Sequence, residues 1–340
     1  MTTQFKQLIF LLLVSIGLAI LFVLVPNDEG VPQLIEKNML QQAIQKNSMA
    51  IEPLPLSVTL NHQKVALGKQ LFHDVRLSKD DTISCASCHG LESAGVDGLP
   101  HSFGIDGQEG SINAPTVYNS GFNFVQFWDG RAGTLEEQAS GPIHNPVEMG
   151  SNWDEVIGKL SQDKRYQMLF SQLYGGGVSP EFVQDAIATF ERSLVTSDSR
   201  FDRYLRGDEK ALSMEEKEGY QLFRSYGCIA CHQGVNIGGN MFQNFGVFGN
   251  YFKDRGHITQ TDYGRFNVTG LERDRYKFKV PSLRLVAKTA PYFHDGTVKT
   301  LNEAVKIMAK YQLGREIPDT EVANIVLFLQ SLEGKQESAL

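Results

Sequence analysis

The stretch SCASCHG, residues 84–90, places two cysteines three positions apart, with a histidine directly after the second. The same spacing returns in GCIACHQG, residues 227–234, and together the two stretches contain every cysteine of the chain. In a CxxCH motif, the two thiols can add to the vinyl groups of one haem while the adjacent imidazole reaches the iron. The sequence therefore predicts two covalently bound haem c groups, which use two sets of residues: Cys85, Cys88 and His89, and Cys228, Cys231 and His232.

Three other kinds of site also use closely spaced cysteines: a redox dithiol, a zinc site and a disulfide. A thioredoxin-like dithiol has no use for the histidine that follows. The two halves of a zinc ribbon would lie much closer in sequence than Cys85 and Cys228. Because the motif occurs twice and uses all the cysteines, we favour covalent haem over these alternatives.

Length and charge set the broad class of the protein. A chain of 340 residues with a formal net charge of −7 is long enough for two packed domains of common size. It has no run of lysine and arginine and no basic face, so we expect no nucleic-acid partner.

The amino terminus carries an almost unbroken apolar run at residues 8–25. The run is longer than the core of about 7–15 residues usual in a signal peptide and approaches the ~20 residues of a membrane-spanning helix. We expect residues 1–25 to be an uncleaved inner-membrane anchor that leaves the rest of the chain in the periplasm; a cleaved signal peptide is the alternative. The proline-containing residues 26–58 predict a linker, with one short helix near 34–45.

A duplication extends well beyond the two CxxCH motifs. Both are preceded by a Gly-x-Gln-Leu-Phe block and followed by blocks of the types Pro-x-x, Phe-x-Asp-Gly and Thr-Leu-x-Glu, in the same order. Each unit closes on a similar helix, in which Ile187, Phe190, Ser193 and Leu194 correspond to Ile325, Phe328, Ser331 and Leu332. The repeat predicts a mainly α fold of two cytochrome c-like domains joined by long loops, over residues 59–200 and 201–336.

Two local signals support helix starts in these units. Ser179 followed by Pro180 and Glu181 is typical of a helix N-terminus. Ser213 with Glu216 forms a capping-box pattern ahead of the second CxxCH.

The two halves differ at the place where a second axial ligand to the iron is expected. Met308 follows Asp295 in a stretch predicted to be helical, residues 300–311, and Pro142 lies the same number of residues beyond Asp129. A thioether can ligate haem iron and raise its potential, which suits electron transfer, whereas proline cannot bind iron. Met308 could alternatively be a core methionine. We interpret it as an axial ligand and expect the first haem to keep an open position.

The segment that replaces the missing ligand, residues 141–149, carries a carboxylate at Glu148. Splitting the O–O bond of a peroxide requires a group that accepts a proton from one oxygen and returns it to the other. Glu148 is the candidate for this role, with a surface glutamate as the alternative, and His144 is interpreted as a loop residue.

With these features, the chain resembles the bacterial di-haem cytochrome c peroxidase family from about residue 60 to 335. The likeness rests on both CxxCH motifs and on six further blocks: Asn113-Ala-Pro-Thr-Val, Gln126-Phe-Trp-Asp-Gly-Arg-Ala, the run from Gln138 to Met149, Gly264-Arg-Phe-Asn-Val-Thr, Thr289-Ala-Pro-Tyr-Phe-His-Asp, and Met308.

The resemblance implies roles for individual residues. Glu148 would be the acid/base, Gln138 would line the peroxide pocket, Trp128 would lie on the electron path between the haems, and Met308 would ligate the electron-accepting haem. It also implies a calcium ion held by Asn113 and by the main-chain carbonyls of Thr289 and Pro291; calcium favours such oxygen donors.

One departure from the family concerns the resting state. Many relatives carry a histidine that caps the peroxidatic iron before activation, and this sequence has Ile105 at that place and a histidine four residues earlier, at His101. We expect the iron to be open; a displaced cap at His101 is the alternative.

The sequence thus predicts a peroxidase that reduces hydrogen peroxide with electrons from a small carrier, either a cytochrome c or a copper protein. The resemblance adds a homodimer as a common assembly. A di-haem electron-transfer protein without turnover is one alternative. A di-haem enzyme that oxidises protein tryptophans is another, but that enzyme has tyrosine in place of the axial methionine, so Met308 argues against it.

Overall fold

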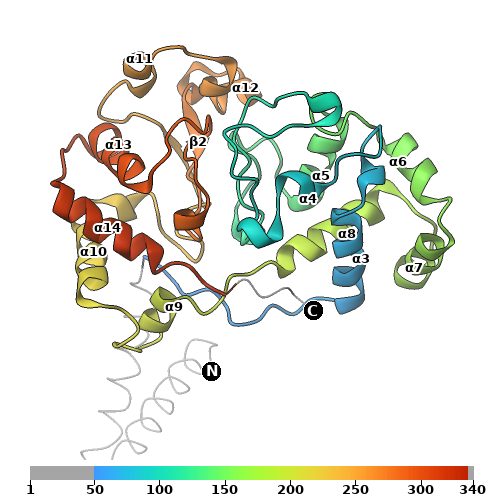
Figure 1. Cartoon of the computed structure of the whole chain (residues 1–340), viewed down its shortest axis with the longest axis horizontal. Coiled ribbons are helices and arrows are strands. Elements are labelled where there is room, and N and C mark those ends of the chain that lie inside the picture. The colour runs from blue at the N-terminus through green and yellow to red at the C-terminus, as the bar shows by residue number, and fades with distance from the viewer. Residues whose placement is uncertain (1–49, 336–340) are drawn as a thin grey trace, which may run out of the picture. The chain divides into compact units, whose positions relative to one another are not determined.

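The computed structural model describes residues 50–335, which form one compact unit (Figure 1). The predicted anchor at 8–25 and the predicted helix near 34–45 lie outside the described residues. Within 50–335, no helix is long and apolar enough to cross a bilayer. The fold is mainly helical, as the sequence predicts.

The first repeat contributes six α-helices and four 3-10 turns. They are α3 His62–Phe72, η1 Val75–Leu77, α4 Cys85–Cys88, η2 Leu91–Ser93, η3 Ile105–Gly107, η4 Ser120–Phe122, α5 Leu135–His144, α6 Trp153–Leu160, α7 Lys164–Tyr174 and α8 Pro180–Ser193.

The second repeat has the same kind of content with one small addition, a two-stranded antiparallel ribbon. Its elements are α9 Arg200–Leu205, α10 Met214–Ser225, η5 Cys228–Ala230, β1 Phe242–Asn244, α11 Tyr251–Arg255, η6 Gln260–Tyr263, α12 Phe266–Thr269, η7 Glu272–Asp274, β2 Lys277–Lys279, η8 Val286–Lys288, α13 Leu301–Leu313 and α14 Asp319–Gln330.

The predicted helix starts are confirmed. The Ser179 side chain accepts from the Phe182 amide at the start of α8, and Pro180 occupies its first turn. Ser213 and Glu216 form a reciprocal capping box on α10. These ends form where predicted because the side chains satisfy backbone amides that the helix itself leaves without partners.

Each repeat is built on one close helix pair, α3 with α8 and α10 with α14 (Figure 1). A Cβ atom added at Gly68 would lie 1.9 Å from the Ala186 carbonyl oxygen, and one added at Gly219 would lie 1.9 Å from the Asn324 carbonyl oxygen. The repeated glycine is therefore required at both crossings, since any side chain would push the helices apart. The duplication seen in the sequence is a duplication of this packing.

Two separate hydrophobic cores follow from the two helix pairs. One is centred on Leu71, Phe72 and Phe190, and the other on Phe201 and Phe328. Burial of these large side chains provides the main stabilisation of each half. The core of each half packs against its own CxxCH segment, because Cys85 borders the first core and Cys228 the second.

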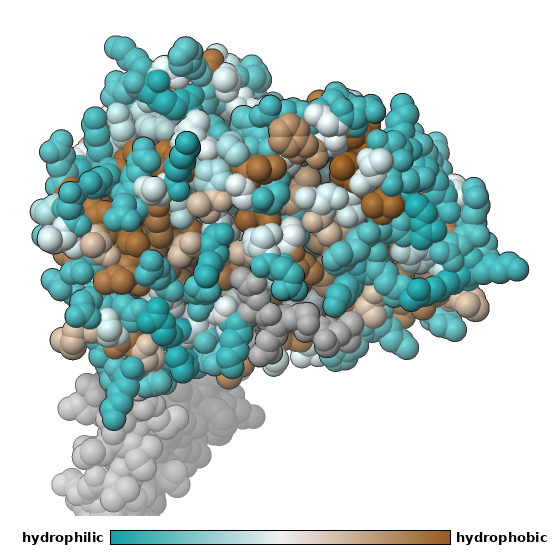
Figure 2. Space-filling view, in the orientation of Figure 1, coloured by the Kyte–Doolittle hydropathy of each residue, from teal (hydrophilic) through white to brown (hydrophobic). Residues whose placement is uncertain are grey.

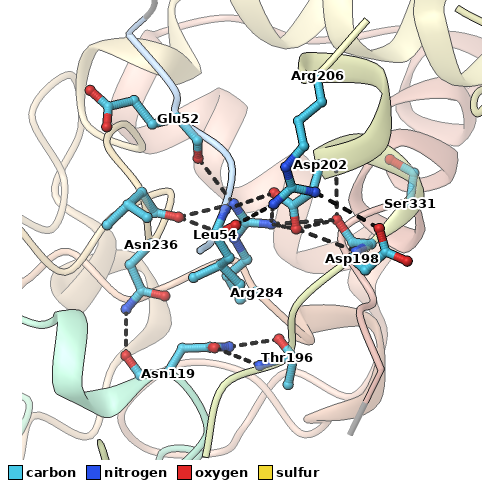
Figure 3. A network of polar contacts seen from close by, with 12 residues as sticks. Glu52, Leu54, Asn119, Thr196, Asp198, Asp202, Arg206, Asn236, Arg284 and Ser331 are labelled. Atoms are coloured by element: carbon cyan, nitrogen blue, oxygen red, sulfur yellow. Dashed lines mark hydrogen bonds and ion pairs between the residues drawn. The ribbon is translucent and has the colours of Figure 1, made fainter. Parts of the chain in front are cut away.

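The end of the predicted linker is packed against the second half. Ile51 is 1% exposed and Leu54 is fully buried. The Leu54 amide donates to Asp202, and the guanidinium of Arg284 donates to the carbonyl of Glu52 (Figure 3). Residues 51–54, at the end of the predicted linker, are therefore packed and hydrogen-bonded to the second half.

A fully buried ion pair lies at the centre of this network. Arg284 Nη1 lies 2.8 Å from Asp202 Oδ1, and neither side chain is exposed to solvent. Arg284 Nη2 also donates to the Val235 carbonyl at 2.9 Å. Because each charge is paired and its remaining hydrogen-bonding groups are largely used, the burial of the pair is tolerated.

One local expectation is wrong. Residues 141–144 are not loop but the last turn of α5, which continues through Pro142 to His144. The Met149 amide donates to the Pro142 carbonyl at 3.1 Å, so the chain folds back directly after the helix. His144 is therefore a helical residue, and the loop begins at Asn145.

Candidate functional site: two facing cavities

Each of the two CxxCH motifs lines a cavity of its own, and these two cavities are similar in size. The N-terminal cavity, about 420 Å³, is lined by Cys85, Cys88 and His89. The C-terminal cavity, about 460 Å³, is lined by Cys228, Cys231 and His232. Both volumes lie within the range of about 300–1,000 Å³ usual for cofactor sites. The four thiols form no disulfide, and because the two cysteine pairs line different cavities they cannot form one zinc ribbon.

His89 is held in the tautomer that a metal ligand requires. Its Nδ1 lies 3.2 Å from the Gly95 carbonyl oxygen, and because a carbonyl only accepts, Nδ1 carries the proton. The lone pair is then on Nε2, free to bind a metal. Burial lowers the pKa of His89, and lowers that of His232 to about 4, so both rings are neutral at pH 7. Neutral imidazoles and unpaired thiols in cavities of this size fit covalent haem.

The C-terminal cavity brings Met308 together with His232. Met308 projects from α13, which begins at a Thr300 cap and covers the predicted helical stretch. Figure 2 shows apolar side chains gathered at the surface over α13 and α14. Val247 and Phe248, which also line this cavity, are 50% and 69% exposed, so its mouth is apolar.

The N-terminal cavity has Pro142 where the repeat has Met308, and it gains two polar side chains. Gln138 and Pro142 reach it from α5, and Glu148 from the following loop. The first cavity thus has the amide of Gln138 and the carboxylate of Glu148 near Pro142, whereas the matching place in the second cavity is occupied by Met308. This arrangement suits a polar ligand in the first cavity and a more apolar group in the second.

Glu148 is held by main-chain and side-chain contacts. Its carbonyl accepts from the Ile105 amide at 2.8 Å, and its Oε1 accepts from Asn145 Nδ2 at 2.6 Å. Burial raises the pKa of Glu148, while the Asn145 hydrogen bond and the charge of Arg131 act in the opposite direction. A carboxyl group with a raised pKa that faces a cavity is suited to exchange protons near neutral pH.

Trp128 lies in the wall that the two cavities share. Its indole lines both, and Nε1 donates to the Asn113 carbonyl oxygen at 3.0 Å. The main chain of Lys279 donates to the Trp128 carbonyl at 2.8 Å, which ties this wall to β2. The indole is thus held by a bond to Asn113 in the first half, and the main chain that carries it is held by a bond to Lys279 in the second half.

The three residues expected at a calcium site border the same cavity. Asn113, Thr289 and Pro291 line the C-terminal cavity. Asn113 Nδ2 donates to the carbonyls of Leu99 and Pro100 at 2.8 and 3.3 Å, which leaves its Oδ1 available as a ligand. One amide oxygen and two carbonyl oxygens are the kind of donors that calcium uses, with waters completing the shell.

Neither His101 nor Ile105 lines the N-terminal cavity. His101 Nδ1 lies 3.1 Å from Glu109 Oε1, in a surface pair. Ile105 is buried, and the methyl group at its end packs on Gly150. His144 also lies outside the cavity, with its ring near that of Trp153.

Glu191 and Lys279 are buried ionisable residues that line the cavities without having been predicted. Glu191, on α8, is 5% exposed and faces the N-terminal cavity. Lys279, on β2, is 6% exposed and lies in the shared wall, where burial lowers its pKa to about 8 against the opposing charge of Asp129. The repeat contained a signal for Glu191, because the residue after Phe190 is charged whereas the residue after Phe328 is leucine.

One cluster of potential metal ligands in the described chain has a different explanation. Asp262, His294 and Asp295 converge, but Arg255 already forms ion pairs with both carboxylates. His294 Nε2 lies 2.7 Å from Asp262 Oδ1. This cluster is a buried polar network in which the arginine supplies the positive charge.

Comparison with known proteins agrees with this geometry. Residues 62–210 match the family model described as di-haem cytochrome c peroxidase. The cytochrome c551 peroxidase of Nitrosomonas europaea is 46% identical over 287 residues, which cover 84% of this chain and 84% of that protein. The chain belongs to the di-haem cytochrome c peroxidase family. Relatives at 44–53% identity are named as cytochrome c peroxidases, and the family implies two haem c groups, which the two cavities fit.

Two further similarities refine the picture. The cytochrome c peroxidase Ccp of Escherichia coli (strain K12) is 53% identical over 285 residues, which cover 84% of this chain but 61% of that longer protein. A crystal structure of a MauG-like protein associated with microbial copper homeostasis matches with a TM-score of 0.72 and 29% identity, covering 83% of this chain and 92% of that one.

Proposed function

We propose that this chain reduces hydrogen peroxide to water with electrons from a small carrier protein, a cytochrome c or a copper protein. His232 and Met308 would hold the haem that accepts these electrons, His89 would hold the haem that uses them, and Trp128 would lie on the path between the two. The proposal is carried by one observation: Met308 lines one CxxCH cavity, whereas Pro142, Glu148 and Gln138 line the other.

Haem groups bound at the two motifs would supply electron storage and the reaction with peroxide; the chain's own residues supply the rest. Glu148 accepts a proton from one peroxide oxygen and returns it to the other, so that the leaving oxygen departs as water. The Asn145 amide holds Oε1 of that carboxylate and leaves Oε2 for the proton. The Gln138 side chain orients the peroxide by hydrogen bonding.

The remaining parts of the proposal concern the resting state and the ion. Haem held at His89 would keep an open position at rest, which is supported by the absence of His101 from the residues that line this cavity. Calcium, held by Asn113, Thr289 and Pro291, would join the two halves beside Trp128 and keep the electron path in place. The chain would act in the periplasm, tethered through residues 8–25, and would assemble as a homodimer.

The alternative chemistry is oxidation of protein tryptophans, as we infer for relatives with an axial tyrosine. Met308 in the cavity of His232 favours the peroxidase, because a thioether raises the potential of the electron-accepting haem. An electron-transfer protein without turnover would have no use for an acid/base group such as Glu148 beside a bound peroxide.

The test is peroxide consumption by the haem-loaded protein with a reduced cytochrome c as donor. Glu148→Gln keeps the shape of the side chain and removes its proton exchange, so turnover should fall by about 10²–10⁴-fold while the haem content is unchanged. Glu137→Gln, an exposed neighbour on α5, is the matched control and should turn over like the parent. Full activity in Glu148→Gln, or no peroxide consumption by the parent protein, would reject the proposed function.

A further inference from the structure

The carboxyl group of Glu191 is buried and has no polar partner in the described part of the chain. The side chain is 5% exposed, and no hydrogen bond or ion pair reaches it. Its carboxylate oxygens are not fully enclosed by protein atoms, and the residue lines the N-terminal cavity. The carboxyl group therefore opens onto the space in which Cys85, Cys88 and His89 would hold a haem.

The charged groups around Glu191 do not neutralise it. Arg192, the next residue on α8, is engaged by Glu136 of α5 through two hydrogen bonds of 2.6 and 2.9 Å. Lys64 of α3 is paired with Asp185, further back along α8. The turn η4, which also packs against α8, has no ionisable residue, and the Cys85 thiol of α4 lies close enough for the charge of Glu191 to raise its pKa.

The second half of the molecule provides a natural comparison. Glu191 directly follows Phe190, and the residue that directly follows the matching Phe328 is Leu329. Leu329 is 4% exposed and lines the C-terminal cavity from the equivalent helix, α14. The same place in the repeat is thus apolar beside one motif and acidic beside the other.

We propose that Glu191 is a proton acceptor coupled to the oxidation state of the haem in the N-terminal cavity. The proposal rests on the proposed function only in presuming that Cys85, Cys88 and His89 bind haem. When one electron from the carrier enters this haem, the Glu191 carboxylate takes up one proton from water, and the net charge of the site stays the same. The reverse occurs on oxidation.

The physical reason is electrostatic. An added electron and an unpaired carboxylate repel each other strongly in a cavity of low dielectric constant, and protonation removes that repulsion. Burial raises the pKa of Glu191 to about 8, against the charge of Arg192, so the group can change protonation near neutral pH. An anionic Glu191 stabilises the oxidised haem and lowers its midpoint potential; the neutral acid does not.

The experiment is a spectroelectrochemical titration of the haem-loaded protein at a series of pH values on either side of 8, in which each haem is followed separately. In the parent protein, the reduction equilibrium of the N-terminal haem should become up to tenfold less favourable per pH unit, which is about 59 mV for a one-electron couple. Glu191→Gln and Glu191→Leu should abolish this slope and keep the potential at its low-pH value. The C-terminal haem, beside Leu329, should show no such slope in any of the three proteins.

A pH slope that persists in Glu191→Gln, or its absence from the parent protein, would overturn the proposal. If a variant fails to bind haem, infrared difference spectroscopy of the parent protein tests the proposal without any variant. Reduction should produce a carboxylic acid C=O band that shifts in D₂O. The absence of such a band would contradict proton uptake by Glu191. The titration uses no peroxide, so a protein that shows the coupling but consumes no peroxide would refute the proposed function and leave this inference intact.

Discussion

Met308 and Pro142 stand at equivalent positions of the two repeats, and each side chain lines the cavity of its own half. The duplicated scaffold is otherwise closely matched, down to the glycine at each helix crossing. The exchange places a methionine on the helix beside one CxxCH motif and a proline at the matching place beside the other. The proposed function depends on this asymmetry between the two cavities.

Replacement of Trp128 by phenylalanine should slow electron transfer between the two haems, because the indole lies in the wall common to both cavities. The change also removes the bond to the Asn113 carbonyl, at a cost of about 1–3 kcal/mol in unfolding free energy. Stopped-flow absorbance after mixing the half-reduced protein with peroxide measures the transfer. Trp153→Phe is the matched control, since Trp153 is the other tryptophan and also donates a hydrogen bond, to Ser140 Oγ at 3.2 Å. Equal rates of electron transfer between the haems in the two variants would show that Trp128 does not lie on the electron path.

The pH dependence of turnover should report Glu148. A base must be ionised to accept a proton, so kcat/KM should fall as the pH drops through the pKa of Glu148, which burial raises above the ordinary value of 4.5. Asn145 opposes that rise, so Asn145→Ala should move this acid limb to higher pH by about one unit, given about 1.5–3 kcal/mol for a hydrogen bond to a charged group. Steady-state rates over the acidic range provide the measurement; an acid limb that does not move in Asn145→Ala would show that another group controls it.

The repeated glycines should be intolerant of a side chain. Gly68→Ala and Gly219→Ala each place a methyl group against a backbone carbonyl, and each should lower the unfolding free energy by at least about 1–3 kcal/mol. Gly158→Ala in α6 is the control, because nothing lies within 4 Å of the added methyl, and it should be neutral or stabilise the helix by about 0.5–1 kcal/mol. Thermal unfolding of the three variants distinguishes these outcomes. A normal melting temperature for Gly68→Ala would contradict the close crossing of α3 and α8.

The buried pair of Arg284 and Asp202 should matter far more than a surface pair. Arg284→Met leaves the Asp202 carboxylate buried without its partner and should cost about 3–5 kcal/mol. Lys288→Met removes an exposed pair with Glu333 and should cost no more than about 1 kcal/mol. Denaturant unfolding gives both values, and limited proteolysis should show release of the segment around Leu54 in Arg284→Met alone. Equal losses in the two variants would show that the network does not hold that segment.

Local signals explain why much of the fold could be predicted from the sequence. The caps at Ser179 and Ser213 act on adjacent backbone, and the CxxCH spacing is itself a chemical requirement, so neither depends on distant residues. The continuation of α5 through Pro142 was not predicted, because proline usually ends a helix, and here the fold-back of the chain at Met149 supports the last turn.

The candidate site was predicted in part. Glu148, Gln138, Trp128, Met308 and Asn113 line the cavities, although their roles stay predictions until tested. Glu191 and Lys279 were missed because their importance lies in burial without a partner, which depends on how the helices and β2 pack. The Glu191 position could have been found by comparing the repeats residue by residue, whereas no sequence signal distinguished Lys279 from a surface lysine.

The most direct test of the asymmetry is low-temperature EPR of the half-reduced protein, with and without an added small ligand such as azide, in the parent and in Met308→Leu. We predict that the parent protein retains only the ferric signal of the His89 haem, that azide changes this signal, and that Met308→Leu loses the high-potential haem. A ferric signal that azide leaves unaltered in every oxidation state, with both irons six-coordinate, would contradict the account, because peroxide would then have no place to bind.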